Sequence, residues 1–176
     1  MRVLTWKEAS KFVKVADKRG NWRERVYIRL ALGTGQRPGA ICELRWDQVD
    51  TVNETIDFRT NDVRKKRRAL VTVNAMVKEA LALAKAHTDG DYILHWSGKH
   101  LKDPRWMVRE LSKAAKIPDV TPHVFRHTVA SLLLQGGEDL LKVSRLLGHS
   151  STHITETVYF QHPPSWLKDT TSKLKF

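Results

Sequence analysis

The feature of this sequence that most limits its fold is a change in hydrophobic spacing in the middle of the chain. Between Trp46 and Val73 apolar and polar residues alternate, as in Thr55–Phe58 and Ala69–Val73, which is the period-two pattern of β-strands. Elsewhere the apolar residues follow helical spacing. We therefore predict an α+β fold, mainly α-helical, with a hairpin or small antiparallel β-sheet near its middle.

Capping signals place the expected helices along the chain. Thr5 and Glu8 have the spacing of a capping box, which predicts a helix from there to about Lys18. Residues 22–32 are nearly all apolar in their second half, as expected of a buried central helix that the following Gly-Thr-Gly segment ends. Pro38 suits the first turn of the next helix. Further helices are expected at about 74–86, 103–116, 121–135 and 138–147, a short strand at 92–94, and a last helical segment before Tyr159.

Length and charge indicate one globular domain that binds a polyanion. The 176 residues, 41% of them hydrophobic, suffice for a single core. Lys and Arg outnumber Asp and Glu 31 to 19, which gives a formal net charge of +12 and favours nucleic acid as the partner. No membrane association is expected, because the sequence has no signal peptide and no apolar run of about 18 residues. We expect a soluble, intracellular protein whose one cysteine, Cys42, is a small core residue.

Basic residues and one tyrosine, spread over the chain, form a set suited to displacement at a phosphodiester. Such a reaction needs a nucleophile in line, cations or donors on the non-bridging oxygens, and a proton for the leaving oxygen. Arg37 follows a glycine-rich segment, and His149 follows a glycine that ends a predicted helix. His123 and Arg126 stand three apart on another helix, so both face the same way. Tyr159 supplies a phenol oxygen. Each residue alone has an ordinary structural explanation, and only the combination predicts chemistry.

Three separated segments resemble the catalytic domain of the tyrosine recombinases, the phage-type integrases. Residues 33–47, Gly-Thr-Gly-Gln-Arg-Pro-Gly-Ala-Ile-Cys-Glu-Leu-Arg-Trp-Asp, are similar to the family's first-arginine box. Residues 121–128, Thr-Pro-His-Val-Phe-Arg-His-Thr, are similar to its His-x-x-Arg box. Leu-Leu-Gly-His-Ser-Ser at 146–151, followed by Thr-Glu-Thr-Val-Tyr at 155–159, is similar to its terminal box. The resemblance extends from about residue 4 to residue 166.

The resemblance implies a site-specific recombinase that cleaves and rejoins DNA strands without a metal or nucleotide cofactor. It implies that Tyr159 attacks the scissile phosphate to give a 3′-phosphotyrosyl enzyme and a free 5′-hydroxyl, and that a second 5′-hydroxyl reverses the step. It also implies that Arg37 and Arg126 hold the non-bridging oxygens while His123 and His149 assist. The covalent link conserves the energy of the broken phosphodiester, so no ATP is implied.

The basic run at 64–68 lies in the predicted hairpin, where the family carries a lysine that acts as general acid. Alignment with the family's hairpin favours Lys65 for this role, and the alternative is that the whole run only binds phosphate backbone. The other members of the run are expected to bind DNA in either case: Arg64, Lys66, Arg67 and Arg68. The implied partner is double-stranded DNA, on which four active sites assemble as a tetrameric synapse, whereas a free monomer is compatible with the sequence. The setting implied is a bacterial cytoplasm or nucleoid, or a phage-encoded protein.

Two features depart from the family pattern. Many members carry an acidic residue three positions after the first arginine, where this chain has Ala40, and Glu43, one helical turn further, is the candidate to replace it. The family usually has a separate N-terminal DNA-binding domain, and residues 1–176 are expected to form the catalytic domain alone. On this expectation, binding to a duplex is weak and strongly salt-dependent.

Three other hypotheses about the function remain open. Ala40 leaves room for a catalytically inactive, integrase-like DNA-binding protein. The helices flanking Gly136-Gly137 have lengths suited to a helix-turn-helix repressor, although the second opens with two carboxylates, which DNA phosphates repel. A metal-dependent hydrolase is suggested by two histidine pairs at ligand spacing, His123 with His127 and His149 with His153.

Overall fold

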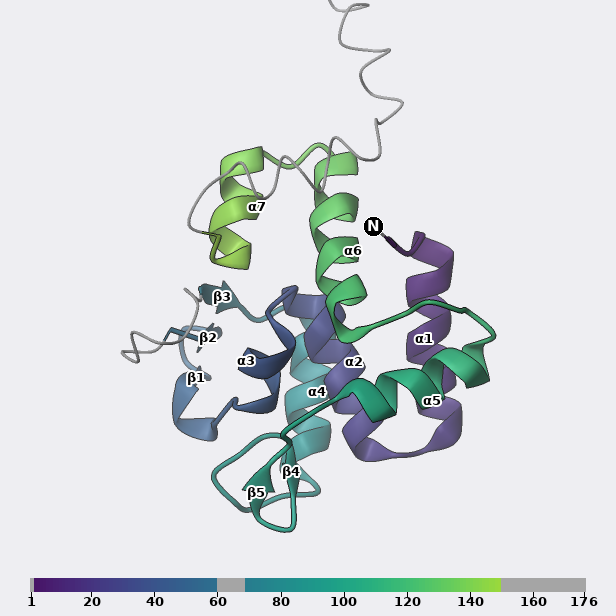
Figure 1. The fold of residues 1–176 in the computed structure, drawn as a ribbon. Helices are drawn as coiled ribbons and strands as arrows, with labels where there is room; N and C mark the ends of the chain where they lie inside the picture. The colour runs from purple at the N-terminus through teal and green to yellow at the C-terminus, as the bar shows by residue number, and fades with distance from the viewer. Residues whose placement is uncertain (1, 60–68, 150–176) are drawn as a thin grey trace, which may run out of the picture.

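The computed structural model describes residues 2–59 and 69–149, and it has the predicted, mainly α-helical α+β fold (Figure 1). The elements in chain order are α1 (Trp6–Arg19), α2 (Trp22–Thr34), α3 (Pro38–Cys42), a 3-10 turn (Trp46–Gln48), β1 (Val49–Asp50), β2 (Thr55–Asp57), β3 (Leu70–Thr72), α4 (Ala75–Lys85), β4 (His95–Trp96), β5 (Lys99–His100), α5 (Arg105–Ala115), α6 (Pro122–Gln135) and α7 (Leu140–Leu147).

The predicted side-chain caps form at the starts of two helices, α1 and α4, but not at Thr121 before α6. At α1 the Glu8 amide donates to Thr5 Oγ1 at 3.2 Å and the Thr5 amide donates to Glu8 Oε2 at 2.9 Å, which completes the capping box. Asn74 Oδ1 accepts from the third amide of α4 at 3.0 Å. At α6 the Thr121 side chain makes no capping bond, so the start depends on Pro122, whose fixed φ suits the first helical position.

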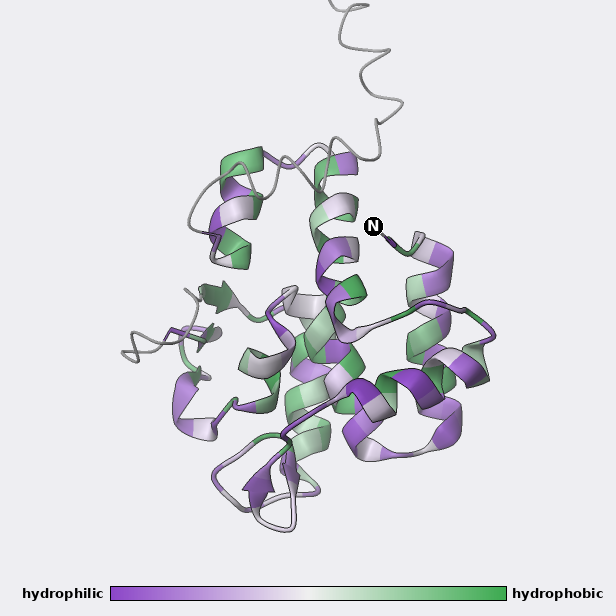
Figure 2. Cartoon of the chain, in the orientation of Figure 1, coloured by the Kyte–Doolittle hydropathy of each residue, from purple (hydrophilic) through white to green (hydrophobic). Residues whose placement is uncertain are grey.

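Helix α2 forms the centre of the molecule and contacts α1, α3, α4, α5 and α6. Its apolar residues are buried almost all round, as the unbroken hydrophobic run predicts. Phe12 of α1 and Phe125 of α6 meet edge to face in the same core, with ring centroids 5.2 Å apart. Figure 2 shows that the central helix α4 is mostly hydrophobic, whereas the β4–β5 hairpin at the edge of the molecule is hydrophilic.

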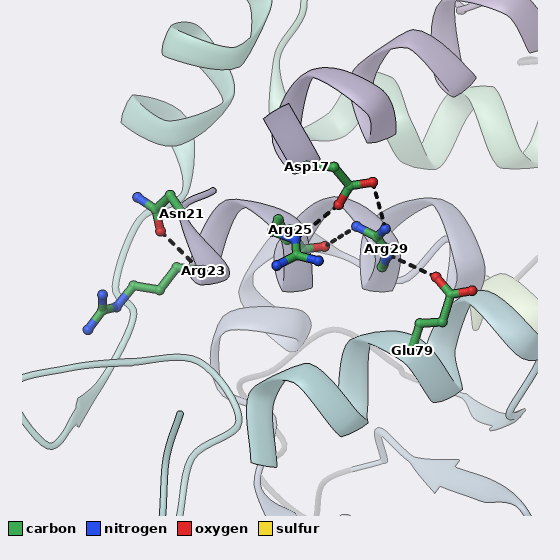
Figure 3. A network of polar contacts seen from close by, with 6 residues as sticks. All are labelled: Asp17, Asn21, Arg23, Arg25, Arg29 and Glu79. Carbon is green, nitrogen blue, oxygen red and sulfur yellow. Dashed lines mark hydrogen bonds and ion pairs between the residues drawn. The ribbon is translucent and has the colours of Figure 1, made fainter. Parts of the chain in front are cut away.

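A polar network ties the central helix to its neighbours (Figure 3). The guanidinium of Arg29, whose side chain is 9% exposed, donates to Asp17 of α1 at 2.9 Å and to Glu79 of α4 at 3.2 Å. Arg25 also binds Asp17, at 3.0 Å. The hydrogen bond from Arg29 and the second from Arg25 hold the pKa of Asp17 below its usual value. The network joins α1, α2 and α4 and gives the buried guanidinium of Arg29 two carboxylate partners.

The predicted sheet is three-stranded and antiparallel in the order β1-β2-β3, with Ile56 paired to Val49 on one side and to Val71 on the other. Ile56 and Val71 are buried, whereas Thr55 and Leu70 are more accessible, which is the alternation that the sequence predicted. The basic run 64–68 lies outside the described residues.

Four boundaries differ from the sequence prediction. Helix α5 begins at Arg105 and not at 103, and the Asp103 side chain accepts from the Arg105 amide at 2.9 Å. Helix α2 continues through Gly33 to Thr34, because Gly35, with a φ of 64°, is the left-handed residue that ends it. The strand expected at 92–94 is only a single bridge from Tyr92 to Arg45, and the strand begins at His95, where it forms a hairpin with β5. Helix α7 begins at Leu140 and not at 138, because the Asp139 side chain caps it by accepting from the Lys142 amide at 3.0 Å.

Two further findings concern membrane-spanning helices and the cysteine. Among the helices in the described ranges, none combines the length and apolar character needed to cross a bilayer. Cys42 is 1% exposed, which confirms its prediction as a core residue, and burial raises the pKa of its thiol to about 12. A thiol with this pKa is protonated at neutral pH and therefore a poor nucleophile.

Candidate active site

The C-terminus of α7 is the centre of the candidate site. Gly148, with a φ of 65°, lets the chain turn, and its amide donates to the Arg145 carbonyl at 3.0 Å. The His149 amide donates to the Ser144 carbonyl at 3.0 Å. These two bonds form a Schellman motif, with Gly148 at the left-handed position and His149 directly after it. The glycine stop predicted before His149 is confirmed, and the motif fixes the backbone from which the imidazole projects.

The same helix end leaves carbonyl groups that no amide of the helix can reach. They accept instead from three side chains of other elements. Gln36 Nε2 donates to the Leu146 carbonyl at 2.6 Å, and Arg126 Nη2 donates to the Leu147 carbonyl at 2.8 Å. Arg37 Nη1 donates to the Gly148 carbonyl at 3.5 Å. The negative end of the α7 dipole favours the two guanidinium groups in these positions. Arg37 and Arg126, 89 positions apart in the sequence, therefore meet beside His149.

Close packing makes this convergence geometrically feasible. A Cβ at Gly35 would lie 2.8 Å from a methyl group of Leu147 and 2.9 Å from a methyl group of Val129. Only glycine therefore allows the end of α2 to contact both α6 and α7 at this point. The Gly35 carbonyl, in turn, accepts from Arg126 Nη1 at 3.0 Å. Arg126 thus bridges the end of α2 and the end of α7.

Burial and like charge shape the electrostatics of Arg126. The residue is 5% exposed, and the bonds described for its guanidinium go to two carbonyl oxygens. Desolvation, and secondarily the charge of Arg37, lower the pKa of Arg126 to about 9. The group is still charged at neutral pH. Two cations that disfavour each other beside a helix end create a positive potential that an anion between them would relieve.

His149 lies in the same field. Its pKa is lowered to about 4, first by desolvation and then by the charges of Arg126, Arg37 and His127. At neutral pH the imidazole is therefore uncharged and has one donor and one acceptor nitrogen. His127, on the turn of α6 next to Arg126, has a pKa lowered mainly by burial, with smaller contributions from His123 and Arg126.

The remaining predicted residues are His123, which lies on α6, and residues outside the described ranges. His123 is exposed in the first turn of α6, one turn before the buried Arg126. Tyr159 and Lys65 lie outside the described residues, and so do the other members of the basic run, Arg64, Lys66, Arg67 and Arg68.

Two points raised by the sequence concern the surroundings of the cluster. Ala40, which stands where many family members have an acid, is 2% exposed in α3, and Glu43 is the residue that ends this helix. Support of Arg37 by Glu43 stays a prediction. Within 2–59 and 69–149, no three His, Cys, Asp or Glu side chains cluster as a metal site requires.

A model of the phage integrase family matches residues 2–165. The chain belongs to the phage integrase family. The tyrosine recombinase XerD of Corynebacterium glutamicum is 30% identical over 151 residues, covering 80% of this chain and 48% of that protein. The crystal structure of a XerA recombinase matches with a TM-score of 0.82 and 27% identity, covering 100% of this chain and 66% of that one.

A more distant structure shares the fold of this integrase-family chain. The XerH site-specific recombinase bound to its palindromic difH substrate, in a post-cleavage complex, matches with a TM-score of 0.78 and 22% identity, over 97% of this chain and 52% of that one. This integrase-family chain spans about half the length of relatives such as XerD, of which it covers 48%.

Sequence reasoning missed one residue of the candidate site. Gln36 is 2% exposed and makes the shortest of the three side-chain bonds to the end of α7. Gln36 lies within the segment similar to the first-arginine box, but its side chain is uncharged and the sequence assigns it no role there. The available signal was its position between Gly35 and Arg37. That position does not reveal a hydrogen-bond partner 110 positions away.

Proposed function

We propose that this chain, residues 1–176, is the catalytic domain of a site-specific tyrosine recombinase, which cleaves and rejoins double-stranded DNA through a covalent 3′-phosphotyrosyl intermediate. Membership of the phage integrase family supports the reaction class. The net charge of +12 supports a polyanionic substrate. The proposal requires no metal and no nucleotide cofactor, because the phosphotyrosine conserves the phosphodiester energy for the rejoining step.

The observation that carries the proposal is the meeting of Arg37, Arg126 and His149 at the end of α7. Two guanidinium groups lie on neighbouring carbonyls. The planar fork of each can donate two parallel N–H bonds, which suits the non-bridging oxygens of a phosphate. Their positive field favours the charge that builds up on those oxygens in the transition state. The neutral imidazole of His149 offers a further donor.

The other roles rest on the family assignment. Tyr159 Oη attacks the phosphorus, a P–O bond to tyrosine forms, and the bond to the 5′-oxygen breaks. Lys65 protonates the leaving 5′-oxygen, and His123 takes the phenol proton or donates to the phosphate. The flanking Arg64, Lys66, Arg67 and Arg68 bind the DNA backbone. Active copies assemble on DNA into a tetrameric synapse, from a protein that is monomeric when free.

Trapping the covalent intermediate tests the proposal. A duplex with a nick near the cleavage site loses the fragment that carries the 5′-hydroxyl, so rejoining fails and the adduct accumulates. We expect a shifted band for the wild type, none for Tyr159→Phe, and a mass-labelled peptide that contains Tyr159. An adduct on another residue, or a wild type that binds DNA but never forms an adduct, contradicts the proposal.

A leaving-group substrate tests the lysine assignment separately. In this substrate sulfur replaces the bridging 5′-oxygen of the scissile phosphate, and the 5′-thiolate leaves without needing a proton. The substrate therefore restores cleavage only where the general acid has been removed. We expect this substrate to rescue Lys65→Ala and to leave Lys66→Ala, the matched control, unchanged. Rescue of Lys66→Ala instead moves the role to that residue.

A further inference from the structure

The side chain of Gln36 links the segment that carries Arg37 to the end of α7, which carries His149. It follows Gly35, precedes Arg37 and is 2% exposed. Its Nε2 donates to the Leu146 carbonyl at 2.6 Å and lies 3.4 Å from the Thr34 carbonyl. Both neighbours of this end of the amide are acceptors, so only the NH₂ group can face them. Gln36 therefore acts as a donor toward the end of α7.

Helix α7 depends on such bonds for its position. Most of its apolar side chains pack in a small cluster with α6, formed by Ala130, Leu134, Val143 and Leu147, whereas Leu146 packs against the main core around α2. Figure 1 shows α7 beside α6 and away from α1 and α5. The end of α7 is held by the packing of Leu146 on the main core and the contact of Leu147 with Gly35, and by the hydrogen bonds from Gln36, Arg126 and Arg37.

The three donors to the end of α7 differ in whether they also bind phosphate in the proposed reaction. The guanidinium groups of Arg37 and Arg126 are the proposed phosphate ligands, so a bound phosphate competes with the α7 carbonyls for their N–H groups. Gln36 is uncharged and has no such competing task. Its bond to the Leu146 carbonyl can therefore persist when the arginines turn to the phosphate.

The other end of the same amide supports a functional role. Gln36 Oε1 is buried and has no hydrogen-bond partner within residues 2–59 and 69–149. A buried acceptor left in this way destabilises the folded state, so stability alone does not favour a glutamine here. The donor bond to the Leu146 carbonyl is the feature of this side chain that favours glutamine at the position.

We propose that Gln36 is a positioning residue: it holds the C-terminus of α7, and with it His149, in register with Arg37 and Arg126. The inference rests on the proposed function for its catalytic consequence, but its structural part concerns the free protein and is tested without DNA.

The first test measures the titration of His149 by NMR in Gln36→Met, a substitution of similar length that removes the donor. If the α7 terminus moves away from the arginines, the pKa of His149 rises from about 4 toward the ordinary value of about 6.5. Gln48→Met is the matched control, because Gln48 Nε2 also donates to a carbonyl at 2.6 Å, that of Asp57 in the sheet. The control should lose stability without changing the His149 titration. An unchanged titration in a folded Gln36→Met protein overturns the proposal.

The second test separates positioning from binding. With the nicked duplex, we expect single-turnover cleavage by Gln36→Met to slow by about 10- to 100-fold, the effect of a misplacement of about 1 Å. The dissociation constant for the same DNA should change less than about twofold, because Gln36 is buried and does not contact DNA. A wild-type rate in this variant overturns the catalytic part. If the wild type itself forms no adduct, the proposed function fails, while the His149 titration still decides the positioning.

A measurement on the wild type covers the case in which Gln36→Met does not fold. The Gln36 side-chain amide protons should exchange slowly with solvent and show nuclear Overhauser contacts to residues 146 and 147. Fast exchange without these contacts overturns the proposal.

Discussion

A single glycine decides whether the end of α2 can approach α6 and α7. At Gly35 a methyl group would meet Leu147 at 2.8 Å and Val129 at 2.9 Å, on a backbone with a φ of 64°. We expect Gly35→Ala to lower the free energy of unfolding by about 2–4 kcal/mol, from left-handed strain plus overpacking. Gly39→Ala is the control: a Cβ there has no atom within 4 Å, and the residue lies in α3, so a gain of about 0.5–1 kcal/mol is expected. Equal effects of the two substitutions in urea unfolding would contradict this account.

The histidine beside that contact should report the charge of the site. Its folded pKa of about 4 lies below the unfolded value of about 6.5, so between these values only the unfolded state binds the proton. His149 therefore lowers stability as pH falls from about 6.5 to 4 and changes it no further below that. We expect the NMR titration of His149 to shift upward in Arg37→Gln, which removes a nearby cation, and upward in the wild type when inorganic phosphate is added. Chloride at equal ionic strength is the control, and a phosphate effect that persists undiminished in Arg37→Gln would argue against binding there.

At the scale of elements, α2 is held by a charged residue as well as by its apolar faces. Arg29 connects it to α1 and α4 through Asp17 and Glu79. We expect Arg29→Met to cost about 2 kcal/mol, because charge-assisted bonds of a buried guanidinium are lost. Arg59→Met, which removes a bridge to Asp57 from a side chain that is 62% exposed, should cost less than about 1 kcal/mol. Chemical denaturation of both variants compares them directly, and a similar cost for each would show that the network adds nothing to the packing of α2.

The elements also show why sequence predicts some features and misses others. Thr5, Asn74 and Gly148 act on residues within a few positions, so the local pattern contains the whole cause. Gly33 and Gly35 look equivalent along the chain, but Gly33 stays helical and packs against α4, whereas Gly35 has a left-handed φ of 64° and packs against α6 and α7. The prediction that Arg37 and Arg126 lie close together came from the family resemblance and not from their spacing in the sequence. The partner of Gln36 depends on a tertiary contact that no local pattern carries.

For the whole molecule, the net charge of +12 makes DNA affinity a matter of released counterions. If the chain neutralises about five phosphates, the logarithm of the association constant should fall with the logarithm of salt concentration with a slope of about −4.5. Fluorescence anisotropy of a labelled duplex between about 50 and 200 mM salt measures this slope and should show weak binding at the upper end. Replacing Lys66 by Ala should flatten the slope by about one phosphate contact and leave adduct formation intact, whereas Tyr159→Phe should leave the slope unchanged and abolish the adduct. Nanomolar affinity that is insensitive to salt would mean that base or shape recognition, and not the phosphate backbone, dominates binding by this chain.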